Sequence, residues 1–264
     1  MKHLAKYWSI FQITLINSLA YPMDFVGRSL LMIPFMWIFY QLWKVTFAAS
    51  GTDTLSGMTL ITTMWYLMLA ETIELSRPQL ARTISENVKD GSIAYLLNKP
   101  YSFLLYQFST SMGETVFRAL TNALIGTLMV WWLVGSPPSA QGWLFASVAV
   151  VGAWVLNFCI TCLIGLSAFL VEDVAPFTWI YQKLVFILGG FLIPLHLYPE
   201  WLQVIAKSLP FAAMIYGPAQ LFIAPSWGLF GEILLMQTLW ISVFSAVLVL
   251  SYRRGMTYLA VNGG

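Results

Sequence analysis

The sequence predicts an all-α membrane protein that crosses the bilayer several times, and two observations support this prediction. Of the 264 residues, 59% are hydrophobic and only 9% are charged, and the mean hydropathy is +0.77. Soluble globular proteins carry roughly 25% charged residues, so this chain has too few charges to cover a water-exposed surface. The second observation is a series of long apolar runs, each close to the roughly 20 residues that a helix needs to span a bilayer.

These apolar runs predict six transmembrane helices. The expected spans are residues 25–43, 58–75, 106–134, 143–171, 177–193 and 233–252. The fourth contains no charged residue, whereas Lys183 interrupts the fifth. Residues 1–22 come before the first span and mix basic residues with Tyr7, Trp8 and other apolar side chains, a pattern that predicts a helix lying along the membrane surface. Residues 1–20 lack the order of a cleavable signal peptide.

Lysine and arginine set the expected orientation. If the N-terminus is cytoplasmic, most of them fall on the inner side: Lys2, Lys6, Arg28, Arg77, Arg82, Lys89, Lys99, Arg253 and Arg254. Only Lys44 and Lys207 then fall in outer loops. Because cytoplasmic loops carry the excess of Lys and Arg, we expect a multi-pass protein with both termini in the cytoplasm.

The region between the fifth and sixth spans is apolar, yet glycine and proline interrupt it repeatedly. Residues 189–202 contain Gly190, Pro194 and Pro199, and residues 201–222 are too apolar for a water-exposed loop although Pro210 breaks them. Backbone that leaves a helix at membrane depth must satisfy its polar groups on protein or in a water-lined cavity. We therefore expect short re-entrant helices here, near the exit or entry of a transport path.

The longest polar interval, residues 76–100, is predicted to be cytoplasmic. Leu80, Ile84 and Val88 recur at the spacing of an amphipathic helix. A short apolar group follows, consisting of Ile93, Tyr95, Leu96 and Leu97, and we expect it to be exposed. Such a group suits docking into a groove on a partner protein, and a solvated linker is the alternative.

Several charged residues fall inside the predicted spans. Glu114 and Arg118 lie four residues apart on one helix face and can pair. Lys183 lies in the fifth span, where Glu71 or Glu74 could be its partner. Charges in lipid mark either a polar path or structural ion pairs. We favour the structural pair for Glu114 and Arg118 and leave both interpretations open for Lys183.

The sequence does not predict a catalytic centre. It lacks a G-x-x-x-x-G-K-[ST] phosphate loop, so ATP hydrolysis would require a separate polypeptide. His196 with Glu200 is too small a set for a metal site, and we expect no bound metal. Cys159 and Cys162 lie in an apolar run without histidine or acidic neighbours, so we interpret them as packing residues.

Residues 86–100 resemble the cytoplasmic segment between helices two and three of ABC-2-type transporter permeases. Residues 190–211 resemble the same family's region before its last helix. The layout is also similar, so the resemblance covers residues 1–264 as a single transmembrane domain. Its parts are the interfacial helix (residues 1–22), a coupling segment (76–103) and the outer re-entrant region (194–230).

The resemblance assigns roles to two groups of residues. Those expected to couple to an ATPase are Arg82, Glu86, Asp90, Gly91, Ile93, Leu96, Lys99 and Pro100. Those expected at an outer gate are Gly190, Pro194, Pro199 and Pro210.

The resemblance also implies a function. The chain would be the permease of an ATP-driven exporter in a bacterial inner membrane, moving a lipid-like, amphiphilic or drug-like substrate. Its expected partners are ATPase subunits, which bind ATP and Mg²⁺, a second permease that is identical or related, and membrane lipid; nucleic acid is not expected. The main alternative is an ion-coupled secondary transporter or channel that uses Glu114, Arg118 and Lys183 as an ion path. An intramembrane enzyme is less consistent with the residues.

Overall fold

The computed structural model describes residues 2–20, 27, 29–171 and 173–262, and it is 82% helical. Within these ranges there is no β-strand, only an isolated bridge between Leu55 and Met58. The prediction of an all-α protein is therefore confirmed. Residues 25, 26 and 28, near the start of the first predicted span, lie outside the described residues.

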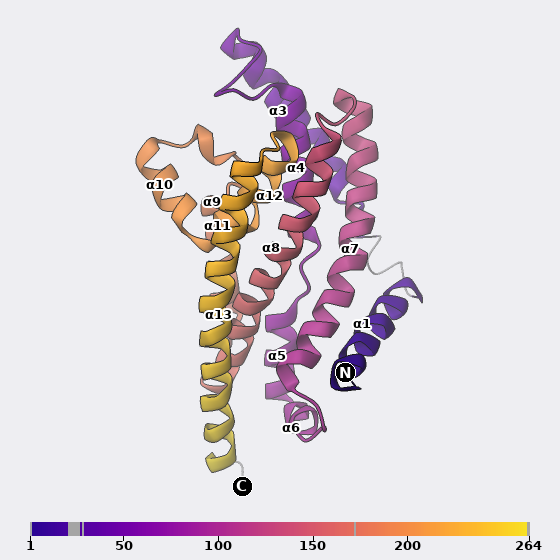
Figure 1. Cartoon of the computed structure of the whole chain (residues 1–264), viewed down its shortest axis with the longest axis vertical. Coiled ribbons are helices and arrows are strands. Elements are labelled where there is room, and N and C mark those ends of the chain that lie inside the picture. The colour runs from indigo at the N-terminus through magenta and orange to yellow at the C-terminus, as the bar shows by residue number, and fades with distance from the viewer. Residues whose placement is uncertain (1, 21–26, 28, 172, 263–264) are drawn as a thin grey trace.

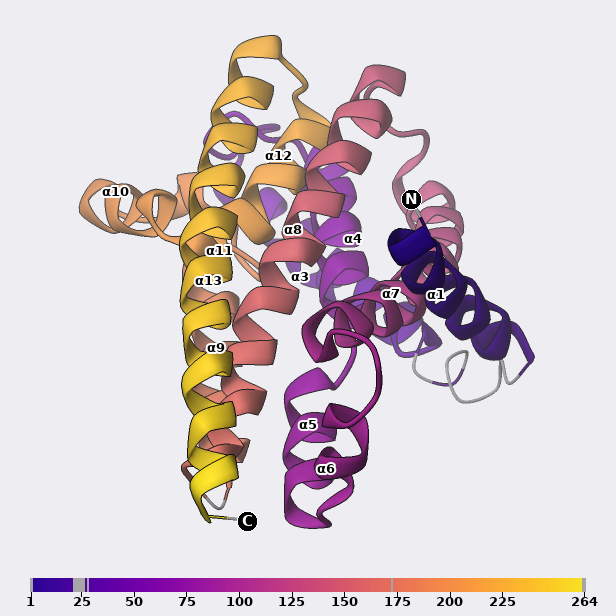
Figure 2. The ribbon, with the colours of Figure 1, turned by 60° about the horizontal axis from the view of Figure 1, so that its bottom comes forward.

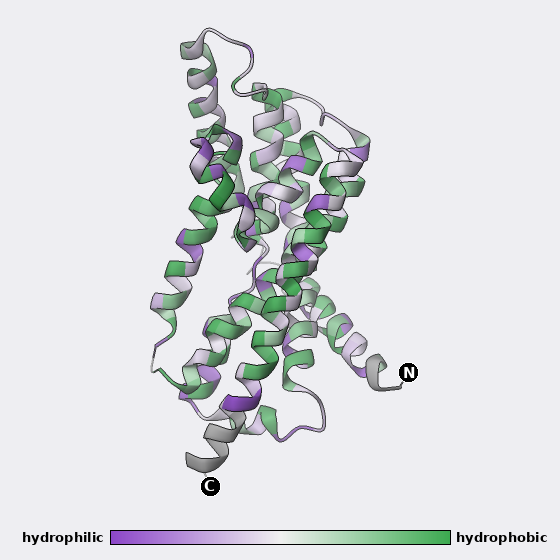
Figure 3. Ribbon diagram, turned by 60° about the vertical axis from the view of Figure 1, so that its left-hand side comes forward, coloured by the Kyte–Doolittle hydropathy of each residue, from purple (hydrophilic) through white to green (hydrophobic). Residues whose placement is uncertain are grey.

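Three described helices are long and apolar enough to cross a membrane (Figure 1). They are α7 (Phe103–Val134), α8 (Ala140–Leu166, extended by the 3₁₀ turn Ser167–Phe169) and α13 (Trp227–Asn262). They correspond to the third, fourth and sixth predicted spans. Apolar residues colour much of their length in Figure 3. The other three predicted spans overlap shorter helices: α3 (Met32–Ser50), α4 (Leu60–Leu75) and α9 (Ala175–Leu188). Helix α3 continues to Ser50, beyond the predicted end of the first span at residue 43. Crossing of the membrane by these helices stays a prediction.

Helix α4 forms the centre of the molecule. Its N-terminus is fixed by a capping box, in which Thr59 Oγ1 accepts from Thr62 N at 3.2 Å and Thr62 Oγ1 accepts from Thr59 N at 2.9 Å. Every residue from 63 to 73 is buried. Gly126 of α7 lies directly against Met32 and Met68, so α7 contacts α3 and α4 closely. Most of α4 therefore faces protein in all directions.

Helix α13 lies beside α8, and a buried glutamine joins them to the short helices between α9 and α13 (Figure 1). Gln237 Nε2 donates to Ala149 O at 2.8 Å and to Ala213 O at 2.9 Å. A polar side chain among apolar helices needs such partners, because an unmade hydrogen bond there is costly. Gln237 thus fixes the position of α13 against two other elements.

The region between the fifth and sixth predicted spans consists of a 3₁₀ turn, η2 (Leu195–Leu197), and three short helices. The helices are α10 (Glu200–Ser208), α11 (Pro210–Met214) and α12 (Tyr216–Ile223). α11 and α12 are largely buried, whereas α10 projects to one side (Figure 2). The sequence predicted short helices separated at proline and glycine, and the structure has them. Their re-entrant position in the membrane stays a prediction.

The N-terminal helix α1 (Lys2–Ala20) packs across α7 (Figure 2). A Cβ at Gly113 of α7 would lie 2.9 Å from Phe11 O, so the two helices meet without an intervening side chain. Trp8 and Ile16 of α1 are exposed. An apolar outer face is what a helix at a membrane surface requires, although its position at the membrane stays a prediction.

Candidate functional site: the coupling segment and a polar pocket

Residues 76–103 fold into a short helical hairpin at one end of the molecule. It contains α5 (Leu80–Lys89) and α6 (Ser92–Leu97), joined at Asp90 and Gly91. Gly91 has φ +76°, a left-handed conformation that favours glycine. Asp90 Oδ1 accepts from Ser92 N at 2.8 Å, and hydrogen bonding to Ser92 lowers the pKa of Asp90. The bond therefore stabilises the turn above the ordinary carboxyl pKa and is lost as the pH falls through the lowered pKa.

We expect replacement of Gly91 by alanine to loosen this turn. A side chain with Cβ disfavours the left-handed region by roughly 1–2 kcal/mol, and asparagine tolerates it better. Amide hydrogen exchange of α5 and α6 should rise in Gly91→Ala and stay closer to wild type in Gly91→Asn. Equal exchange in both variants would contradict the assigned turn.

The inner face of the hairpin packs on α8. Leu80 is 5% exposed and Ile84 is fully buried, which confirms the amphipathic helix read from the sequence. A Cβ at Gly165 of α8 would lie 2.9 Å from Ile84 Cβ, so α5 rests directly on the α8 backbone. This contact makes α5 and α8 one packed unit.

The expected exposure of Ile93 is wrong. Ile93 is 5% exposed because α6 folds back along α5 and joins the apolar cluster that includes Leu80, Ile84 and Phe103. Leu96 is half-buried against the same cluster. Tyr95, a member of the same predicted group, does face outward, with 69% exposure.

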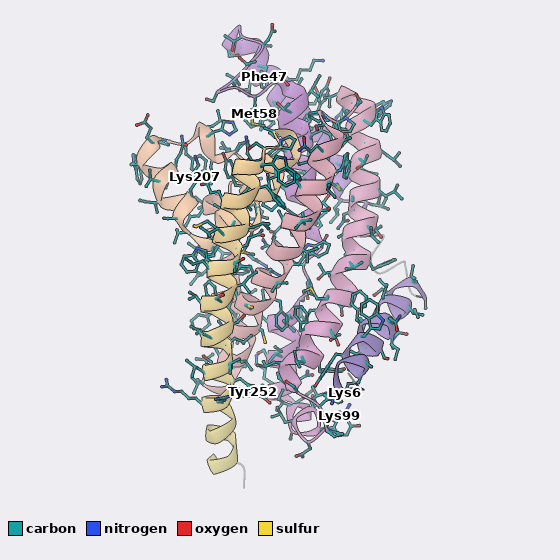
Figure 4. The ribbon with its side chains drawn as sticks, viewed as in Figure 1. Lys6, Phe47, Met58, Lys99, Lys207 and Tyr252 are labelled. Carbon is teal, nitrogen blue, oxygen red and sulfur yellow. The ribbon has the colours of Figure 1, made fainter. Side chains whose placement is uncertain are left out.

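Tyr95 belongs to a cationic and aromatic surface at the end of the hairpin. Lys99 Nζ lies 4.4 Å from the centroid of the Tyr95 ring and 5.8 Å from that of Tyr101. Lys6 of α1 donates to Pro100 O at 3.1 Å, and Figure 4 shows Lys6 and Lys99 close together. Hydrogen bonding to Tyr101 raises the pKa of Lys99, so this surface stays positively charged at neutral pH. Of the other expected coupling residues, Arg82 and Glu86 form an exposed ion pair of 2.7 Å.

Two ion pairs join charged residues within or beside the predicted spans. Arg118 Nη2 lies 2.9 Å from Glu114 Oε2, which agrees with the predicted ion pair, and Arg118 Nη1 donates to Arg77 O at 3.3 Å. Arg77 pairs with Glu74 at 2.8 Å, a contact that the three-residue spacing could have indicated. These pairs lie beside the start of the hairpin.

Lys183 lies at the surface of α9, and its place on a polar path stays a prediction. It is exposed on α9, with Nζ 5.5 Å from the centroid of the Trp179 ring and 5.6 Å from that of Phe186. Among the described residues it forms no ion pair with Glu71 or Glu74, so that suggested pairing is wrong. Its ammonium lies against aromatic rings on its own helix.

A polar pocket of about 390 Å³ lies between the start of α5, α7, α8 and α9. Its wall includes Glu74, Arg77, Arg82, Arg118 and Tyr181. Tyr181 donates to Asn157 Oδ1 at 2.8 Å, which ties α9 to α8 at the pocket wall. A second pocket of about 460 Å³ shares three lining residues with the first: Arg82, Thr178 and Gln182. The sequence did not reveal these pockets, because α9 is distant from α5 along the chain.

The residues expected at an outer gate lie at the breaks between helices. Gly190 follows α9 with φ +68°, and its carbonyl accepts from Tyr66 Oη at 2.6 Å. Pro194 and Pro199 come directly before η2 and α10, and Pro210 begins α11. The hydrogen bond from α4 fixes the first break on the central helix, and the gating role of these residues stays a prediction.

The comparison with protein families matches residues 30–263 to the family described as ABC-2 family transporter protein. The chain belongs to the ABC-2 transporter family. The comparison with curated proteins found no match. Membership makes this protein a membrane-embedded permease component of an ABC transporter, which is not itself catalytic. It also agrees with the long apolar helices and with the resemblance of residues 86–100 and 190–211.

Proposed function

We propose that this chain is the permease of an ATP-driven exporter and that separate ATPase subunits dock on the α5–α6 hairpin. The observation that carries this proposal is the orientation of the hairpin. One face is buried against α8, whereas Tyr95 on the other is 69% exposed beside Lys99. Exposed aromatic residues contribute strongly to binding energy at protein interfaces. ATP and Mg²⁺ would be held by the partner subunits.

The packing of the hairpin suggests how ATP-driven movement reaches the membrane. Ile84 lies against the α8 backbone at Gly165, so α8 must respond when α5 shifts. At the other end, Tyr7 Oη accepts from Ser102 N at 2.9 Å, which links the start of α7 to α1. A nucleotide-dependent movement of the hairpin would therefore bias both long helices between two arrangements.

The proposal includes the assembly and its setting. Two permeases, identical or related, would enclose the path in a bacterial inner membrane, with the hairpin and both termini in the cytoplasm. The re-entrant region would shape the outer gate. An amphiphilic or lipid-like substrate is consistent with the many apolar residues exposed on α7, α9 and α13.

The test is purification of the tagged chain from its native membrane in mild detergent, followed by mass spectrometry. We expect a stoichiometric ATPase with a phosphate-loop motif, and a second permease of related sequence would indicate a heterodimer. A chain that purifies alone and moves solute down an ion gradient would overturn the proposal in favour of a secondary transporter.

A further inference from the structure

The polar pocket beside the hairpin contains a buried arginine whose hydrogen-bonding capacity is largely unused. The Arg77 side chain is 10% exposed, and its one ion pair among the described residues joins Nη1 to Glu74 Oε2 at 2.8 Å. Its Nε, Nη1 and Nη2 atoms are buried, and none of them makes a hydrogen bond within the part of the chain that the structure describes. Buried polar groups are nearly always paired in folded proteins, because an unsatisfied donor costs about 1–3 kcal/mol and more when it is charged. Arg77 lines the pocket, so an acceptor bound there could reach it.

The unpartnered donors of Arg77, rather than the net charge around the pocket, favour an anionic acceptor. The pocket wall contains the cationic groups of Arg77, Arg82 and Arg118 and one carboxylate, that of Glu74. Two more carboxylates lie nearby, because Glu114 pairs with Arg118 and Glu86 pairs with Arg82. A guanidinium has a planar set of donors that matches the oxygens of a phosphate or a carboxylate.

The remaining surroundings favour an amphiphile. Leu75, Pro78, Leu80 and Ala81 supply apolar wall, and the Arg77 guanidinium carbon lies 5.8 Å from the centroid of the Tyr181 ring. The adjoining pocket reaches Trp179 on α9. That helix carries exposed apolar side chains, including Ile180 at 50% exposure and Phe177 at 47%. An acyl chain could lie along this face while its headgroup enters the pocket.

We infer that this pocket binds the phosphate or carboxylate headgroup of an anionic amphiphile, with Arg77 as the main contact. The inference that this molecule is the exported substrate rests on the proposed function, whereas the binding itself does not. Glu74 competes with the ligand for the same guanidinium, so removing the Glu74 charge should strengthen binding and removing Arg77 should weaken it.

The test measures binding to the purified permease by native mass spectrometry and thermal shift. The probes are phosphatidylglycerol, phosphatidylcholine and inorganic phosphate. We expect wild type to retain phosphatidylglycerol over phosphatidylcholine, and Arg77→Gln to lose at least about tenfold in affinity, as removal of a charged hydrogen bond implies. Glu74→Gln should bind more tightly than wild type, because it removes the negative charge that competes for the Arg77 guanidinium.

Two features keep the result decisive. Arg77→Gln leaves Glu74 without its partner, so Glu74→Gln decides the matter if the first variant fails to fold. A merely structural ion pair would predict no gain of binding in Glu74→Gln. Arg254→Gln, an exposed change of the same charge on α13, is the matched control and should bind like wild type.

The probes also separate the possible sources of the anion. Stabilisation by inorganic phosphate with the same dependence on Arg77 and Glu74 would assign a soluble anion and overturn the headgroup assignment. Equal binding of all probes, or binding unaffected by both variants, would overturn the site itself. Absence of an ATPase partner would overturn the proposed function and leave the binding result standing.

Discussion

Tyr95→Asp is expected to remove the ATPase from the purified complex while the permease folds as in wild type. Tyr95 is 69% exposed and contacts the Lys99 ammonium, so a carboxylate there does not disturb the core. In the proposed complex this position is covered, so the substitution would replace an aromatic contact with a charge that must lose its water. Losing a central aromatic contact typically costs about 2 kcal/mol or more, which corresponds to roughly a thirtyfold weaker complex. The ratio of ATPase to permease after purification measures the effect.

Ile93→Asp is the informative comparison, because it places the same charge two residues away on the buried side. Ile93 is 5% exposed within the cluster that joins α5, α6, α7 and α8. A carboxylate there should lower the free energy of unfolding of the permease by about 3 kcal/mol, and with it the melting temperature. ATPase retention should also weaken, because the hairpin is damaged. Tyr95→Asp should leave the melting temperature unchanged. Undiminished ATPase retention by Tyr95→Asp would exclude this face of α6 as the docking site.

The hairpin also shows which features could be read from the sequence. The spacing of Leu80, Ile84 and Val88 is local, so it predicted both the helix and its buried face correctly. The burial of Ile93 depends on the turn at Gly91 and on Phe158 of α8, which is remote in the sequence. Local apolar pattern therefore identified a helix pair, but could not tell which side of α6 faces outward.

For the charged residues too, local spacing predicted some contacts, whereas others depend on long-range packing. Pairing of Glu114 with Arg118 follows from their four-residue spacing on one helix, and the structure has that pair. The position of Arg77 beside Tyr181 depends on how α9 folds back, which no local spacing encodes. The surroundings of Lys183 depend on the rotation of α9, so the sequence could not distinguish an ion pair from a polar path. Long-range packing also explains why α4 is buried on all sides although its sequence resembles an ordinary span.

Gly142→Ala is expected to be the most damaging single-methyl change described by the structure. A Cβ at Gly142 of α8 would lie 2.0 Å from Phe222 O and 2.9 Å from its carbonyl carbon, both backbone atoms of α12. No rotamer change can relieve that overlap, so α8 and α12 must move apart. Overpacking of this kind typically costs about 1–3 kcal/mol. Thermal unfolding of the detergent-purified permease, followed by tryptophan fluorescence, measures the loss.

Gly231→Ala is the matched control, since Gly231 lies in the first turns of α13 and has no neighbour within 4 Å of an added Cβ. Alanine is a better helix former than glycine, so this variant should unfold at or slightly above the wild-type temperature. A Gly142→Ala protein as stable as Gly231→Ala would contradict the close contact of α8 with α12.

The consequence of Gly142→Ala should extend to the central helix. Phe222 packs edge-on against Trp65 of α4, with ring centroids 5.9 Å apart, and against Trp143 of α8 at 4.8 Å. Moving α12 away from α8 therefore disturbs the contact that holds α4. Because Tyr66 on the same turn of α4 donates to Gly190 O at the first helix break, transport should fall further than stability alone requires. Transport per folded permease, compared between the two glycine variants, tests that connection.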